Sequence, residues 1–116
     1  MSVWFSSTLG QDLWNPSNRA AEFYLREVRL VEAFIETESG VGDQREDEVT
    51  VEPTALAEFV AVAQEQLDHP TMRAQVIGLL AISAVLLARS NVQFRVVDGW
   101  EQLAHEAEAM SVRMPR

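Results

Sequence analysis

The residues of this sequence whose types and spacing best suit acid–base chemistry are Glu27, Tyr24 and Arg73. Glu27 falls on the apolar side of a predicted helix, where a carboxylate without a partner costs free energy. We therefore expect its carboxyl to be buried, and to be either paired with a cation or neutral. A buried acid with a raised pKa is the kind of group that acts as a general base. If the chain is an enzyme, Glu27 is its expected base, with Tyr24 and Arg73 beside it.

An ion pair that only supports the fold is the favoured interpretation of Glu27. The side chains that are candidates to pair with it are Arg73, Arg89, Arg95 and His105. No second acid, nucleophile or oxyanion donor has a spacing that would complete a catalytic site around this glutamate. The sequence therefore predicts no catalytic residue and favours a protein that is not an enzyme.

Metal binding has little support in the sequence. There is no cysteine, and the only histidines are His69 and His105. Neither belongs to a zinc-binding helix motif such as HExxH. The acidic run at 43–48, DQREDE, lacks the D-x-D-x-D-G ladder of a calcium loop. We therefore expect no metal site and no cofactor.

A second candidate ligand site lies at the start of the first predicted helix. An aromatic ring stands there beside several hydrogen-bonding groups, in Trp14, Asn15, Ser17 and Asn18. Free N–H groups at a helix N-terminus bind anions and carboxylates. The same residues also make a hydrophobic staple and a cap, with Asn15 as N-cap and Pro16 at the first helical position. Capping accounts for the whole motif and is the favoured interpretation.

Acidic residues are concentrated in one part of the chain. The net charge is −9, and residues 36–68 contain ten acids and a single arginine, so this segment carries the whole excess. Such a charge argues against nucleic acid or an anionic membrane as partner, because both require a basic surface. It favours a basic protein partner, which acidic groups steer toward the surface. The acids expected to bind that partner are Asp43, Glu46, Asp47, Glu48, Glu58 and Glu65.

The segment 72–90 has no charge between Arg73 and Arg89, and as a helix it is apolar on every side. Such a helix belongs in the centre of a fold. Its uninterrupted apolar part is about 20 Å long, too short to cross a bilayer comfortably. Its small residues gather on one side (Ala74, Gly78, Ala81, Ala84 and Ala88). This small-residue side predicts either a close contact with another helix of the chain or the seam of a homodimer.

The remaining elements follow from turn and cap signals. The chain begins with a small hairpin, and a helix over 16–38 buries Ala20, Phe23, Tyr24, Val31 and Phe34. A flexible acidic loop over 39–52 enters a short strand near Val49 and ends at Pro53, where the next helix begins. A strand over 92–96 pairs with the N-terminal strand, and Asp98 with Glu101 caps a last helix. The expected fold is therefore a single α+β domain over 1–116. It is mainly α-helical, with four helices around a buried central helix at about 71–90 and a small sheet of short terminal strands.

The opening of the chain carries a family resemblance. Trp4-Phe5, then LWNPSN at 13–18, then Phe23 early in the next helix resemble a family of small actinobacterial proteins known only as a domain of unknown function. The resemblance lies mainly in the LWNPSN motif. It implies a bacterial, cytoplasmic protein and brings no catalytic residue, because that family has no assigned activity. The lack of cysteine and of a secretory signal also favours the cytoplasm.

Three functions remain open on these observations. The first is a non-catalytic interaction protein, of the immunity or inhibitor type, that masks a basic partner with its acidic surface. The second is a small-molecule binder or small enzyme with a cavity near Glu27. The third is a structural homodimer.

Overall fold

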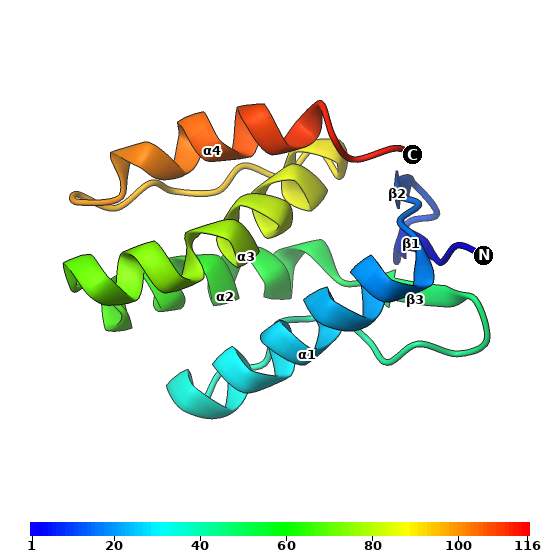
Figure 1. The fold of residues 1–116 in the computed structure, drawn as a ribbon, viewed down its shortest axis with the longest axis horizontal. Helices are drawn as coiled ribbons and strands as arrows, with labels where there is room; N and C mark the ends of the chain where they lie inside the picture. The colour runs from blue at the N-terminus through cyan, green and yellow to red at the C-terminus, as the bar shows by residue number, and fades with distance from the viewer.

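The computed structural model describes residues 1–116 and has an α+β fold in which a small sheet lies at one end of four helices (Figure 1). The elements in chain order are β1 (Trp4–Ser7), β2 (Asp12–Trp14), α1 (Asn18–Ile35), β3 (Glu48–Val51), α2 (Pro53–Gln66), α3 (Pro70–Arg89) and α4 (Glu101–Ser111). Both termini lie at the sheet end of the molecule. The predicted fold class and the predicted number of helices are confirmed.

The sheet has the strand order β2-β1-β3, with β2 antiparallel and β3 parallel to β1. The predicted N-terminal hairpin is therefore correct, and so is the strand at Val49. The hairpin turn is closed by the Ser7 hydroxyl, which accepts hydrogen bonds from the backbone N–H groups of Leu9 and Gln11. Phe5 of β1 anchors the sheet to α1, because its ring packs against the rings of Trp14 and Tyr24.

The strand predicted over 92–96 does not form, and this prediction is wrong. Residues 92–97 run as irregular backbone, and the amide of Gln64 on α2 takes the place of a neighbouring strand. Its Nε2 donates to the carbonyl of Arg95 at 2.7 Å, and its Oε1 accepts from the N–H of Val97 at 2.8 Å. Gln64 is completely buried. The backbone of this segment therefore hydrogen-bonds to one side chain and not to a neighbouring strand.

Helix α1 begins two residues later than predicted and ends earlier, at Ile35. Its N-cap is Ser17, whose hydroxyl accepts from the N–H of Ala20, so the assignment of Asn15 as N-cap is wrong. The carbonyl of Pro16 accepts instead from Val3, which holds this residue against the start of the chain. Because Pro16 pairs with the N-terminal segment, the helix begins after it, at Asn18.

The predicted buried face of α1 is partly wrong. Tyr24 and Val31 are buried as expected, but Ala20 is exposed, and Phe23 and Phe34 are 63% and 68% exposed. The residues that α1 buries are Ala21, Tyr24, Val28, Val31 and Ile35. The helix carries more apolar side chains than one stripe holds, and the fold covers only one of its sides. On a helical wheel, Phe23 and Phe34 define the apolar side, but the fold covers a different side of the helix.

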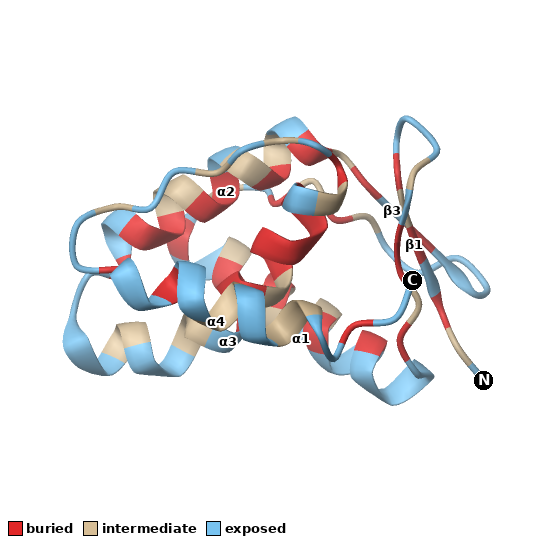
Figure 2. Ribbon diagram, turned by 90° about the horizontal axis from the view of Figure 1, so that it is seen from above, coloured by how far each residue is buried: buried red, intermediate tan, exposed pale blue.

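Helix α3 is buried in its second half only (Figure 2). Residues 79–81 and 83–87 are buried between α2 and α4, whereas residues 71–78 are exposed or half-buried. On the small-residue side, Ala81 and Ala84 are buried, but Ala74, Gly78 and Ala88 are exposed. The helix is long and apolar enough to span a membrane, a property that the core helices of soluble proteins share. The prediction of a wholly buried central helix therefore holds for half of it.

Helix α4 packs on α3 with the predicted stripe. Trp100, Leu103 and Met114 are buried, and Ala107 and Met110 lie half-buried beside them. The capping box predicted from Asp98 and Glu101 is absent, because the N-cap residue is Trp100 and no side chain caps the helix. The indole N–H of Trp100 donates to the carbonyl of Gln64, so the entry of α4 is fixed by packing.

The segment 39–52 follows a defined course from α1 back to the sheet. Val41 bridges to Val51, and Arg45 bridges to Glu48 across a turn in which Glu46 has a positive φ. Gly40 also has a positive φ, and a Cβ on it would lie 2.6 Å from the carbonyl of Glu52. Only glycine fits so close an approach. The flexibility of this segment stays a prediction.

Candidate functional site

Glu27 is half-buried on α1 and has no hydrogen-bond or ion-pair partner. The arginines proposed as its partners are engaged elsewhere. Arg73 pairs with Asp68, Arg95 pairs with Glu65, and Arg89 donates to backbone carbonyls. Burial raises the pKa of the Glu27 carboxyl. The predicted ion pair is therefore wrong, and the shift is toward the neutral form that was its alternative.

The three residues suggested for an enzyme form no hydrogen bond or ion pair with one another. The Tyr24 hydroxyl is fully buried and lies 2.8 Å from the hydroxyl of Ser83. Burial raises the pKa of Tyr24 far above its usual range, so this phenol stays protonated. The Arg73 guanidinium is held by Asp68 near the start of α3. Of these three residues, only Glu27 lines an open space on the surface.

That space is a groove between α1, the end of α2 and the exposed half of α3, with a volume of about 400 Å³. We call it the Glu27 groove. Its walls are Glu27, Leu30, Val31, Phe34, Leu67, Met72, Gln75, Val76 and Leu79. Only the first of these is ionisable. The sequence predicted a cavity near this glutamate, and the groove lies there. The groove is open because no other element covers the facing parts of α1 and α3.

The four residues at the entrance to α1 serve mainly structural roles. Trp14 is buried against the rings of Phe5 and Tyr24, and Ser17 caps the helix. Asn18 is exposed, and its backbone N–H donates to the carbonyl of Met1. Asn15 donates its N–H to Pro115, while its side-chain Oδ1 is buried without a partner. Capping and chain pairing therefore account for most of this motif, with Ser17 and not Asn15 as the cap.

The acids proposed to bind a partner are all exposed. Asp43 pairs with Arg29 and Glu65 pairs with Arg95, and both acids stay largely open to solvent. No ion pair reaches Glu46, Asp47, Glu48 or Glu58. The first three of these follow one another in the turn before and at the start of β3. We call residues 43–48 the acidic turn.

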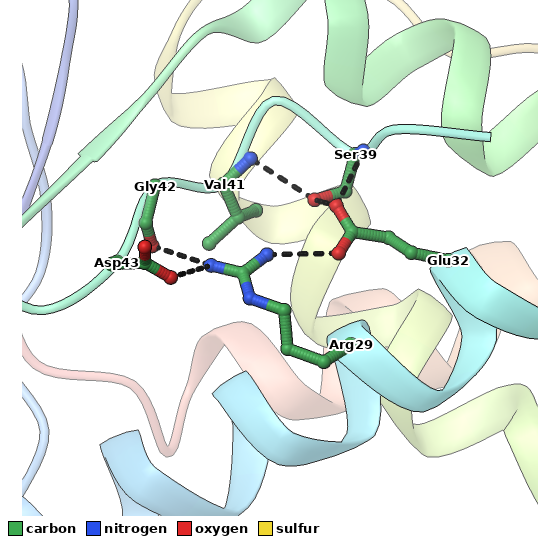
Figure 3. Close-up of polar contacts among 6 residues, drawn as sticks. All are labelled: Arg29, Glu32, Ser39, Val41, Gly42 and Asp43. Atoms are coloured by element: carbon green, nitrogen blue, oxygen red, sulfur yellow. Dashed lines mark hydrogen bonds and ion pairs between the residues drawn. The ribbon is translucent and has the colours of Figure 1, made fainter.

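A polar network that the sequence did not reveal joins α1 to the base of the acidic turn (Figure 3). The Arg29 guanidinium donates to Glu32, to the carbonyl of Gly42 and to Asp43. The Glu32 carboxylate also accepts from the N–H and the hydroxyl of Ser39 at 2.8 and 2.7 Å. Burial alone would raise the pKa of Glu32, but the bonds from Ser39 and Arg29 outweigh it and hold that pKa below its usual range. Only the i, i+3 spacing of Arg29 and Glu32 hinted at this network.

Arg89 forms a second link that the sequence did not suggest. Its guanidinium donates to the carbonyls of Leu13, Ser111 and Met114, which joins α3 to β2 and to the end of the chain. Burial lowers the pKa of Arg89, and the charge of Arg116 lowers it further. The residue sits where a helix C-terminus favours a cation, but its partners are distant carbonyls that no spacing rule identifies.

No group of three or more His, Asp or Glu side chains is arranged to hold a metal ion.

Comparison with known proteins gives a family and no function. No curated protein and no solved structure matches the chain. A family model matches residues 1–116, the whole of the chain. The chain therefore belongs to the family of unknown function DUF6086.

Proposed function

We propose that this protein is a non-catalytic interaction protein of the bacterial cytoplasm that binds a basic protein partner through its acidic turn. The observation that carries the proposal is the exposed run Glu46, Asp47 and Glu48, for which the fold supplies no cation. Arg45 stands in the same turn and makes no ion pair with these acids. Unpaired acids this close together repel one another and attract basic surfaces.

Hydrogen bonds on either side of the acidic turn support this proposal. The N–H of Trp4 donates to the carbonyl of Asp47 at 2.7 Å, and Arg29 holds the carbonyl of Gly42 at 2.8 Å. Both ends of the turn are therefore attached to the folded body. A charged surface on a turn that is attached at both ends loses less conformational entropy on binding than one on a free loop. An inhibitor or immunity protein that masks a basic partner needs such a surface.

The test compares two variants of equal net charge. In the first, Glu46→Gln, Asp47→Asn and Glu48→Gln neutralise the acidic turn. In the second, Asp12→Asn, Glu101→Gln and Glu108→Gln remove three exposed acids elsewhere. Wild-type protein and both variants are used to capture partners from the native lysate in low and high salt, and the association rate of any captured partner is measured.

We expect the partner to be basic, and its association rate to fall about tenfold or more for the first variant while changing little for the second. The rate for the wild type should fall with added salt. Equal losses for the two variants would mean that the partner senses only net charge. Unchanged rates for the first variant would assign the acidic turn to solvation alone.

A further inference from the structure

The Glu27 groove combines apolar walls with one unpaired carboxyl. Leu30 and Phe34 on its rim are 70% and 68% exposed, and Met72, Val76 and Leu79 continue the apolar wall on α3. The polar side chains in the lining are Glu27 and Gln75. Large exposed apolar side chains around a groove are typical of a binding site. Pockets for small molecules are mainly apolar, contain a few orienting polar groups, and measure roughly 300–1,000 Å³. The groove fits that description at about 400 Å³.

The carboxyl of Glu27 is not compensated from within the chain. Burial raises the pKa of the carboxyl, and no arginine or histidine forms an ion pair with it. The arginine two positions along the helix, Arg29, is held by Glu32 and Asp43. Arg73, at the start of the helix that forms the opposite wall, is held by Asp68. An aliphatic residue at position 27 would serve the fold better, because it would carry no desolvation cost.

We propose that the Glu27 groove binds an apolar organic cation. The apolar body covers Leu30 and Phe34 against the wall formed by Val76, and the cationic group pairs with the Glu27 carboxylate. Charge selects this ligand class. An anion would be repelled by Glu27 and by the net charge of −9, and a neutral apolar molecule would leave the half-buried carboxylate unpaired. This site goes beyond the acidic turn, which takes no part in it.

The test uses three probes that share one phenylbutyl body: phenylbutylammonium, phenylbutanol and phenylpentanoate. Binding of each is followed by chemical-shift changes in amide NMR spectra of the wild-type protein. We expect the ammonium probe to bind about tenfold more tightly than the alcohol, as a charge-assisted hydrogen bond in place of a neutral contact implies. The carboxylate probe should bind least. The largest shifts should fall in 27–34 and 72–79.

Three variants separate the carboxyl from the walls. Glu27→Gln should bind the ammonium probe no better than the alcohol. Glu108→Gln, which removes an exposed and unpaired acid on α4, should keep the full preference. Leu30→Ala, at a site exposed enough to leave folding intact, should weaken all three probes alike.

Several outcomes would overturn the proposal. These are a wild-type protein with no saturable binding of the ammonium probe, equal affinity of the wild type for ammonium and alcohol, a preference that persists in Glu27→Gln, or shift changes centred outside the groove. None of the measurements involves the acidic turn, so failure here leaves the proposed function standing, and the reverse is also true.

Discussion

The hydroxyl of Tyr24 on α1 and the hydroxyl of Ser83 on α3 lie 2.8 Å apart in the centre of the core. Ser83 also donates to the carbonyl of Leu79, one turn back along its own helix at 3.0 Å. Both residues are buried, and the Tyr24 hydroxyl has no hydrogen-bond partner other than Ser83. The pair therefore joins α1 to α3, the two helices that form the main walls of the Glu27 groove.

Removing one member of this pair should cost more than removing both. Ser83→Ala leaves the Tyr24 hydroxyl buried without a partner, which should lower the free energy of unfolding by about 1–3 kcal/mol. The double variant with Tyr24→Phe should recover part of that loss. Urea unfolding of the two single variants and the double variant measures the coupling as a double-mutant cycle. Strictly additive losses would show that the two hydroxyls do not stabilise each other.

Gln64 should be among the polar residues on which the fold depends most. Gln64→Leu leaves the N–H of Val97 and the carbonyl of Arg95 without their partner, and we expect a loss of about 2–4 kcal/mol in the free energy of unfolding. Gln102→Leu, at an exposed position on α4, is the matched control and should change little. Amide hydrogen exchange should also quicken at Val97. An unaffected unfolding transition would contradict the role given to this side chain.

Two glutamates on α1 should give the stability opposite dependences on pH. The pKa of Glu27 is raised in the folded state, so its ionisation disfavours folding, and this penalty appears as the pH rises through the unfolded and then the folded pKa. Glu27→Gln should therefore raise the Tm at neutral pH, and the gain should vanish in acid. Thermal melts from acid to neutral pH measure it. A constant difference across that range would mean that the carboxyl is fully hydrated.

Glu32 should behave in the reverse sense. Its folded-state pKa is lowered, so the stability it contributes is present above the unfolded pKa and is lost as the pH falls through the folded pKa. Glu32→Gln should lower the Tm at neutral pH, and the deficit should shrink in acid. Ser39→Ala should reproduce part of the effect, because it removes one of the donors that hold the carboxylate. Equal deficits at both ends of the pH range would argue for packing rather than charge.

Gly78 should tolerate, and benefit from, a side chain. A Cβ at this position meets nothing within 4 Å, so Gly78→Ala should raise the free energy of unfolding by about 0.5–1 kcal/mol through backbone entropy. The same variant addresses the homodimer that the small-residue side of α3 left open. Sedimentation equilibrium should give the same mass for wild type and Gly78→Ala if that side is free. Weaker self-association in the variant would place a second copy there.

The sequence predicted the fold better than it predicted which surfaces are free. The proline signal located the start of α2 at Pro53, whereas the caps predicted at Asn15 and Asp98 did not form. Periodicity failed where one side chain replaced a regular partner, as Gln64 does for 92–97. It failed again on α1, because a wheel shows which residues are apolar and cannot show that the fold leaves Phe23 and Phe34 uncovered.

The candidate site was predicted in part. The odd position of Glu27 among apolar neighbours was visible in the sequence, and its location beside a cavity was expected. Its lack of a partner was not, because pairing depends on where Arg73 and Arg95 come to lie in space. The network of Arg29, Glu32 and Ser39 joins a helix to a loop beyond its end, and no periodic pattern encodes such a contact.

The position of the chain ends separates the two proposed surfaces. Both termini lie at the sheet end, and the N–H of Asn15 bonds to the carbonyl of Pro115, so the last residues are attached beside the first hairpin. The acidic turn lies at that same end, next to β1 (Figure 1). The Glu27 groove opens toward the other end, between the later turns of α1 and the first turns of α3. A bulky domain fused to either terminus, or a surface to which either terminus is tethered, should therefore obstruct a protein partner while leaving a small cation free to enter.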